Sequence, residues 1–312
     1  MILLIGGSGF VGSHIIKLLG KENCYNIDIK PSILYNDITF IHDIREPLNF
    51  NKKVNLVILL AAEHKDDVTP FSLYYDVNVI GTKNVLNFMD NYQIKNLIFF
   101  SSVAVYGMNL KNANEESKTI PFNNYGNSKL KAESEINFWY NNDPINKKVN
   151  IIRPTVIFGQ NNKGNVYNLI SQIVKGKMVQ IGNGFNCKSI AYVENVSSFV
   201  NFIINNTIEG FEIYNYSDKP DLNMNQFISL IKQKSNINYK LMNVPYYFAL
   251  FVGYIFDFTS FLFNKKFSIS SIRIKKFCAN SQIDSSKALT IFKPPFTLEE
   301  GLENTLKHDF NF

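Results

Sequence analysis

A tyrosine and a lysine stand four residues apart in the segment NNYGNSKLKAESE, as Tyr125 and Lys129. In a helix this spacing places both side chains on one face. An ammonium group beside a phenol stabilises the phenolate, so we expect Lys129 to lower the pKa of Tyr125 from about 10 toward that of a working general base. Ser102, which ends the apolar segment NLIFFSS, can hydrogen-bond the same substrate oxygen. The three residues predict proton transfer at a substrate oxygen.

A glycine-rich turn at the start of the chain predicts a dinucleotide site. The apolar segment MILLI runs into GGSGFVG, which places Gly6, Gly9 and Gly12 at G-x-x-G-x-x-G spacing ahead of the helical pattern SHIIKLLG. Glycines let the backbone approach a pyrophosphate, and a helix N-terminus offers it amide donors. Asp28 ends the second strand, where such folds place a carboxylate on the adenosine ribose. That carboxylate would repel a 2′-phosphate, so we expect NAD rather than NADP.

These residues need a scaffold that brings them to one edge of a sheet. Apolar strand segments alternate with helical segments through the first half, which predicts an α/β fold: a Rossmann-type doubly wound parallel sheet with a smaller C-terminal substrate domain. We expect the NAD-binding domain over 1–155, with a returning segment at about 179–205, and the substrate domain over 156–312. Ligands of such sheets bind beyond the carboxyl ends of the strands, where every motif above falls.

The composition restricts the partners. The 312 residues are 46% hydrophobic and 19% charged, with a net charge of +6 from scattered lysines, so nucleic-acid binding is not expected, whereas a diphosphate or an anionic membrane surface is compatible. Three cysteines and four histidines without ligand spacing predict neither a disulfide framework nor a metal site. The opening MILLIGGSGF contains no secretory signal, which favours a cytoplasmic location.

The motifs GGSGFVG, HDIR, LLAAEH, SSVAVYG, YGNSK, IIRPTVIFG and AYVENV stand in the order of the extended short-chain dehydrogenase/reductase family, and the chain resembles its nucleotide-sugar epimerase and dehydratase branch. The resemblance implies bound NAD, with Tyr125 as acid/base, Ser102 as its partner and Lys129 on the nicotinamide ribose. His64 is expected to be a loop residue. The cofactor set that it implies is Gly6, Gly9, Phe10, Val11, Gly12, Asp28, Asp43, Ile44, Ala61, Ala62, Asn78, Tyr125 and Lys129.

The residues after Ser102 bear on the reaction. In this family dehydratases carry an Asp-Glu pair there and decarboxylating members a Glu, whereas this chain has Val103 and Ala104, and no cysteine of the kind used in 3,5-epimerisation is present. The resemblance therefore leaves hydride chemistry at one carbon: 4-epimerisation through a transient 4-keto sugar, or reduction of a 4-keto sugar. A third hypothesis, a non-catalytic NAD-binding protein, conflicts with the intact Ser102, Tyr125 and Lys129.

The resemblance also implies substrate residues. Lys188 and Arg273 match cations that hold phosphate in relatives, with ordinary surface basic residues as the alternative. Ser281 stands where strict hexose epimerases have a bulky aromatic residue, which leaves room for an N-acetyl group at C2.

Four residues depart from the family pattern on the nucleotide side of the substrate. They are Val156, Lys188, Ser189 and Asn195, and they suggest that something other than uridine is bound there.

The segment 244–263, VPYYFALFVGYIFDFTSFLF, predicts an aromatic helix. Gly253, Asp257, Ser260 and Asn264 share one stripe, and Lys265–Lys266 follow the segment. Asp257 would cost roughly 2.5 to 3.5 kcal/mol at the centre of a bilayer, so a membrane span is not expected. A buried helix and a helix lying in a membrane interface both remain open.

A closer resemblance, through SLYYDVNVIGTKNVL, GNVYNL, DKPDLNMNQ and IRIKKFCA, is to family members that interconvert N-acetylglucosamine and N-acetylgalactosamine on undecaprenyl diphosphate for O-antigen synthesis. It implies a lipid-linked N-acetylhexosamine as substrate, and a free UDP-sugar stays the alternative. It also implies a peripheral position on the inner face of the cytoplasmic membrane. The family's habit of pairing suggests a homodimer through the helices that contain Asn78 and Tyr125.

Overall fold

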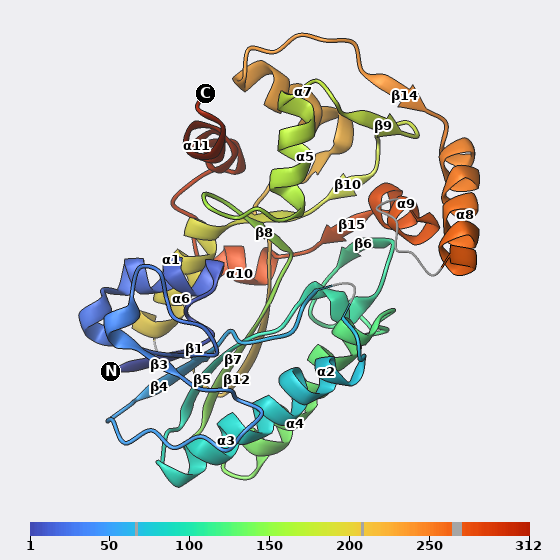
Figure 1. The fold of residues 1–312 in the computed structure, drawn as a ribbon. Helices are drawn as coiled ribbons and strands as arrows, with labels where there is room; N and C mark the ends of the chain where they lie inside the picture. Colours follow the sequence, from blue (N-terminus) through green and yellow to red (C-terminus); the bar gives the residue numbers. More distant parts are fainter. Residues whose placement is uncertain (66–67, 207–208, 264–269) are drawn as a thin grey trace.

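The computed structural model describes residues 1–65, 68–206, 209–263 and 270–312, apart from the side chain of residue 261. Its centre is a parallel sheet of seven strands in the order β12-β7-β5-β4-β1-β2-β3 (Figure 1). The strands are β1 (Ile2–Ile5), β2 (Cys24–Asp28), β3 (Thr39–Ile41), β4 (Leu56–Leu59), β5 (Asn96–Phe100), β7 (Lys148–Pro154) and β12 (Phe211–Tyr216). The predicted doubly wound Rossmann-type sheet is confirmed.

Helices cover both faces of this sheet (Figure 1). The helices α3 (Gly81–Asn91) and α4 (Asn124–Asn141) cover one face, and α1 (Phe10–Leu19), α6 (Val193–Asn206) and α10 (Ser286–Ile291) cover the other. Successive strand residues point to opposite sides, so Leu3 and Ile5 pack beneath α3 and α4, whereas Leu4 packs beneath α1 and α6. Burial on both faces explains why the strands are almost continuously apolar.

The second half of the chain builds a smaller part above the carboxyl ends of the strands (Figure 1). A separate apolar core joins β8 (Val156–Phe158), α5 (Asn165–Val174), β11 (Ile190–Tyr192), α7 (Met224–Lys234) and α11 (Leu298–Phe310). A four-stranded sheet has the order β13-β10-β15-β6, from β13 (Leu222–Asn223), β10 (Cys187–Lys188), β15 (Ser281–Ile283) and β6 (Leu110–Ala113). The last of these strands comes from the first half of the chain.

The returning segment differs from its prediction. Residues 193–216, which form α6 and β12, join the large sheet, whereas β9 (Val179–Ile181) and β10 lie in small sheets outside it. The predicted bounds of 179–205 stay an interpretation, and the segment that reaches the large sheet begins at α6. The strand β12 pairs with β7 over six positions, from Phe211 opposite Val149 to Tyr216 opposite Pro154. The sequence of β12 alone does not predict this pairing. The division near residue 155 stays an interpretation.

The aromatic segment forms α8 (Tyr246–Phe263), which packs against α9 (Ser271–Cys278) at the edge of the smaller part (Figure 1). The helix begins two residues later than expected, because Val244 ends the strand β14 (Met242–Val244), which pairs with β9. Asn264 and Lys265–Lys266 lie outside the described residues. No helix in the described part of the chain combines the length and apolarity needed to cross a bilayer.

Candidate functional site

One large pocket connects the sheet to the smaller part. It has a volume of about 2180 Å³ and extends from the carboxyl ends of β1, β2, β4 and β5 to α8 and α9. Every predicted cofactor and substrate residue except Asn78 lines it. In the described part of the chain no cluster of three His, Cys, Asp or Glu side chains is placed to hold a metal ion.

The glycine turn between β1 and α1 forms one end of this pocket. Gly6 has a φ of +90°, and a Cβ atom there would lie 2.5 Å from the Ala61 backbone nitrogen, so only glycine lets the turn lie this close to the loop after β4. Gly9 directly precedes α1, whose first backbone amides lack helical acceptors. A pyrophosphate fits this arrangement of close backbone and helix N-terminus.

The two carboxylates predicted for the adenosine half lie beside this turn. Asp28 ends β2 and accepts hydrogen bonds from the backbone nitrogens of Ser8 at 3.0 Å and Lys30 at 3.1 Å, which fixes its orientation. Asp43 binds Arg45, whose Nη2 lies 2.5 Å from Oδ2, and this hydrogen bond lowers the pKa of Asp43. Both residues line the pocket, so the chain presents the acidic and backbone groups that an adenosine ribose and a pyrophosphate require.

Tyr125 lies in the first turn of α4, close to Ser102. Asn123 caps this helix by accepting a hydrogen bond from the Gly126 nitrogen at 2.9 Å. Ser102 follows β5, and its Oγ accepts from the Ala104 nitrogen at 3.2 Å. Burial raises the pKa of the Tyr125 phenol, and the hydrogen bond with Ser102 opposes this increase. The positive end of the α4 dipole also favours a phenolate.

Lys129 is buried, and its position corrects one expectation. Its Nζ donates to the Phe100 carbonyl oxygen at 2.6 Å and lies 4.6 Å from the centre of the Phe99 ring. Burial lowers the pKa of Lys129 to about 7, against a smaller opposing effect of Glu133. The expected lowering of the Tyr125 pKa by Lys129 is therefore not found, because the ammonium is held by the end of β5.

A buried network stands behind this lysine. Glu133, one turn further along α4, pairs with Arg153 of β7 at 2.5 Å and accepts a hydrogen bond from Ser101. Arg153 also donates to the Tyr106 hydroxyl at 2.7 Å, and Tyr106 donates to Asn215 of β12 at 2.8 Å. The network thus links β7, α4, β5 and β12 under the site. Sequence reasoning did not find it.

Asn78 does not line the pocket, and its predicted cofactor contact stays a prediction. It is buried in the π-helical turn Asp76–Ile80, where its Oδ1 accepts from the Glu63 nitrogen at 2.8 Å and its Nδ2 donates to Ser128 Oγ at 2.8 Å. Ser128 in turn donates to the Tyr125 carbonyl oxygen at 2.8 Å. Asn78 therefore fixes the loop after β4 against the helix that carries Tyr125.

Three basic residues line the pocket toward α9. Lys188 lies opposite Ser281 across the β10–β15 pair, so the predicted phosphate residue and the predicted specificity residue are neighbours. Its Nζ donates to the Lys276 carbonyl oxygen at 2.8 Å, and burial lowers its pKa to about 8. Arg273 and Lys276 both stand on α9. Sequence reasoning missed Lys276, although its spacing of three residues from Arg273 was a usable signal.

Of the four departures on the nucleotide side, Asn195 is not part of the pocket. It is fully buried in α6, where it donates to Asp218 at 2.9 Å and to the Phe296 carbonyl oxygen at 2.8 Å. Its predicted link to the nucleotide is therefore wrong, because the side chain holds the segment that leads to α11. Val156, Lys188 and Ser189 do line the pocket.

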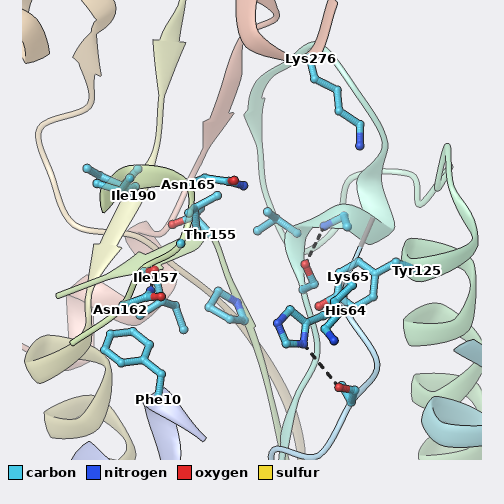
Figure 2. A pocket seen from close by; sticks show the side chains of 18 of the residues that line it. Phe10, His64, Lys65, Tyr125, Thr155, Ile157, Asn162, Asn165, Ile190 and Lys276 are labelled. Carbon is cyan, nitrogen blue, oxygen red and sulfur yellow. Dashed lines mark hydrogen bonds between the residues drawn. The ribbon is translucent and has the colours of Figure 1, made fainter. Parts of the chain in front are cut away.

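Figure 2 shows how residues from distant parts of the chain form the walls of the pocket. Tyr125 shares one wall with His64 and Lys65, and Thr155 and Asn165 lie across from them, while Lys276 points into the space from α9. His64 Nδ1 lies 3.4 Å from the Ala62 carbonyl oxygen, in keeping with a loop residue.

A Rossmann sheet whose glycine turn, acidic β2 end and Tyr125–Ser102 pair surround one pocket defines an enzyme of the short-chain dehydrogenase/reductase type. Residues 2–216 match the model of the NAD dependent epimerase/dehydratase family, and the chain belongs to this family. NAD is its cofactor.

Known proteins resemble the chain over nearly its full length. N-acetyl-alpha-D-glucosaminyl-diphospho-ditrans,octacis-undecaprenol 4-epimerase of Escherichia coli O157:H7 is 47% identical over 99% of this chain and 95% of its own. UDP-glucose 4-epimerase of Vibrio cholerae is 26% identical over 97% and 94%. A solved structure of MoeE5 in complex with UDP-glucose and NAD superimposes with a TM-score of 0.78 at 18% identity, over 99% of this chain and 98% of that one, and supports the fold alone.

Proposed function

We propose that the protein is a 4-epimerase that interconverts N-acetylglucosamine and N-acetylgalactosamine carried on undecaprenyl diphosphate, in the synthesis of a surface polysaccharide. The observation that carries the proposal is the continuity of one pocket from Tyr125 and Ser102, past Lys188 and Arg273, to the apolar side of α8. A diphosphate-linked lipid sugar needs these three environments in this order. The 47% identity to an epimerase named for such a substrate supports it.

In the reaction Tyr125 accepts the proton of the sugar O4 hydroxyl at its phenolate oxygen and later returns it. Ser102 hydrogen-bonds Tyr125 and the same sugar oxygen, which favours the phenolate. Lys129 is held by the Phe100 carbonyl and fixes the end of β5 beside the nicotinamide site. Bound NAD supplies hydride acceptance and return at C4. Val103 and Ala104 offer no acid or base for dehydration.

Inversion at C4 requires that the 4-keto sugar rotate between removal and return of the hydride, so that the hydride reaches the opposite face of the ring. The enzyme must therefore hold the diphosphate firmly and the sugar loosely. Lys188 and Arg273 bind the diphosphate in our proposal, joined by Lys276, and all three line the pocket. Ser281, opposite Lys188, leaves space for the N-acetyl group.

We further propose that α8 seats the protein on the membrane that contains the substrate. Tyr247 is 81% exposed, Phe251 62% and Phe258 63%, so a purely buried helix does not describe this face. The exposed large apolar side chains of the helix are Tyr247, Phe248, Phe251, Tyr254, Ile255, Phe258, Leu262 and Phe263. Lys275 of α9 lies 5.2 Å from the centre of the Tyr254 ring, where it meets anionic head groups.

The assembly that we propose is a homodimer through α4, which contains Tyr125, and the helical segment 72–91, which contains Asn78 and ends in α3. These helices lie side by side on one face of the sheet (Figure 1), and Ile80 and Phe138 expose large apolar side chains on this side. Sedimentation of the purified protein should give the mass of two chains.

The test of the function compares two carriers of the sugar, undecaprenyl diphosphate and UDP. Purified protein receives either N-acetylglucosamine diphospho-undecaprenol in detergent or UDP-N-acetylglucosamine, with no NAD added, and the sugar products are separated. We expect conversion of the lipid form to an equilibrium mixture without net change in reduced cofactor. Conversion of the UDP-sugar alone contradicts the proposal. Stoichiometric oxidation of NADH or NADPH indicates the 4-keto sugar reductase instead.

A further inference from the structure

The far end of the pocket, beyond the three cations, is apolar. Its walls there include Met178, Ile181 and Val244 from the β9–β14 pair and its approach, and Ala249 and Val252 from α8. Ile274 and Phe277 of α9 complete it. A nucleoside needs hydrogen-bond partners for its base and ribose, and these side chains offer none.

The inner side of α8 is distinct from its exposed face. Phe248 and Val252 are one turn apart and line the pocket, whereas Phe251 and Phe258 are exposed and do not. Phe248 lines the pocket and is also 61% exposed. It therefore marks the point where the pocket opens beside the exposed aromatic face.

The third side of α8 holds the helix in place against α9. A Cβ atom at Gly253 would lie 2.8 Å from Ile274 Cδ1, so glycine permits this close approach. Asp257 accepts from the Ser271 nitrogen at 3.2 Å, in the first turn of α9, the helix that Ser270 caps and that carries Arg273 and Lys276. The apolar wall and the cations are thus parts of one unit.

We infer that the apolar end of the pocket binds the first isoprene units of the substrate, which enter it from the diphosphate and leave over Phe248. The inference rests on the proposed function and adds that the enzyme reads the lipid chain itself, not only the diphosphate. Three features carry it: the cations and the apolar walls line one pocket, α8 and α9 supply part of these walls and two of the three cations, and Phe248 belongs both to the pocket and to the exposed aromatic face.

The experiment compares chain lengths without a membrane. N-acetylglucosamine diphosphate is linked to methyl or to farnesyl, and KM and kcat are measured for each with the purified, full-length protein. We expect a KM for the farnesyl form at least about tenfold lower, because each methylene removed from water contributes severalfold to affinity. Val252→Asn and Ala249→Trp should bring the two KM values together by raising the KM of the farnesyl form.

Ile145→Asn, an exposed aliphatic position far from the pocket, is the matched control and should keep the wild-type preference. Bound NAD and the melting temperature confirm that each variant is folded. If Ala249→Trp does not fold, Val252→Asn alone tests the inference. Equal KM values in the wild type, or a preference that survives in the folded variants, overturn the inference and leave the proposed function standing. If the enzyme converts UDP-N-acetylglucosamine but neither the methyl nor the farnesyl diphosphate, the inference and the proposed function are both wrong.

Discussion

At the scale of single residues, Tyr125 is the proposed acid/base residue. In this proposal Tyr125→Phe removes the group that takes the O4 proton, so turnover should fall to the detection limit while bound NAD remains, because the glycine turn and Asp28 are unchanged. Product formation and NAD content of the purified variant measure the two effects. Tyr92→Phe, which changes a partly exposed hydroxyl bound to Asn49 and Asn51, should be neutral. Retained activity in Tyr125→Phe shows that the acid/base residue is another one.

Ser102 is the proposed partner of Tyr125 in this proton transfer. Ser102→Ala should lower kcat/KM by roughly 10²-fold, the scale of a positioned proton-transfer partner. The hydrogen bond with Ser102 lowers the pKa of Tyr125, so its loss raises that pKa further, and the acidic limb of the kcat/KM profile should move to higher pH. Ser134→Ala, on the exposed side of α4, is the control. A profile that keeps its acidic limb argues against contact between the two hydroxyls.

Lys188, a proposed diphosphate ligand, predicts a pH dependence of substrate binding. Its pKa is lowered to about 8 by burial, so its charge is present below that pH and is lost above it. The dissociation constant of a diphosphate-linked sugar, measured by equilibrium binding, should therefore increase as pH rises through about 8. Lys188→Arg keeps the charge, and the increase should move to higher pH. A pH dependence that is unchanged in this variant assigns the increase to another group.

Motif order located most of these residues because each stands at a strand end or on the helix after it. It could not show where a side chain goes when its partner is distant in sequence. Asn78 binds Glu63 and Ser128, and Asn195 binds Asp218 and the Phe296 carbonyl. Lys129 lies on the predicted helix, but its contact with the Phe100 carbonyl follows from how α4 crosses β5, which spacing on α4 does not reveal.

At the scale of elements, we propose that one face of α8 lines the pocket and that another face contacts the membrane. Phe251→Ser with Phe258→Ser removes apolar area from the exposed face, and we expect the protein to move from the membrane pellet to the supernatant on fractionation. Activity on the farnesyl substrate in solution should persist, because neither side chain lines the pocket. Phe71→Ser, also a highly exposed position but on the sheet side, should not change the distribution. Equal release of this control contradicts the assignment of the face.

The stripe of Gly253, Asp257 and Ser260 was visible in the sequence, but its partner was not. A helical projection gives the relative faces of a helix, and only the fold shows that this stripe faces α9. The same limit applies to β12, whose place in the large sheet depends on pairing with β7.

At the scale of the whole molecule, the Glu133–Arg153 pair joins the layers. Both side chains are buried, so Glu133→Ala leaves an uncompensated guanidinium and should lower the free energy of unfolding by about 3–5 kcal/mol. Glu135→Ala, on the same helix, removes a partly exposed pair with Lys83 and should cost less than about 1 kcal/mol. Urea unfolding followed by fluorescence compares the two. An equal decrease of the free energy of unfolding in the two variants shows that the buried pair stabilises the fold no more than the surface pair does.

The contact between Asp257 and the first turn of α9 couples two helices that have different roles in the proposed function. The hydrogen bond from the Ser271 nitrogen and the close approach at Gly253 hold α9 against α8. Arg273 and Lys276 stand on α9, so their position depends on that of α8. In the proposed function, the contact of α8 with a membrane therefore also orients the helix that binds the diphosphate.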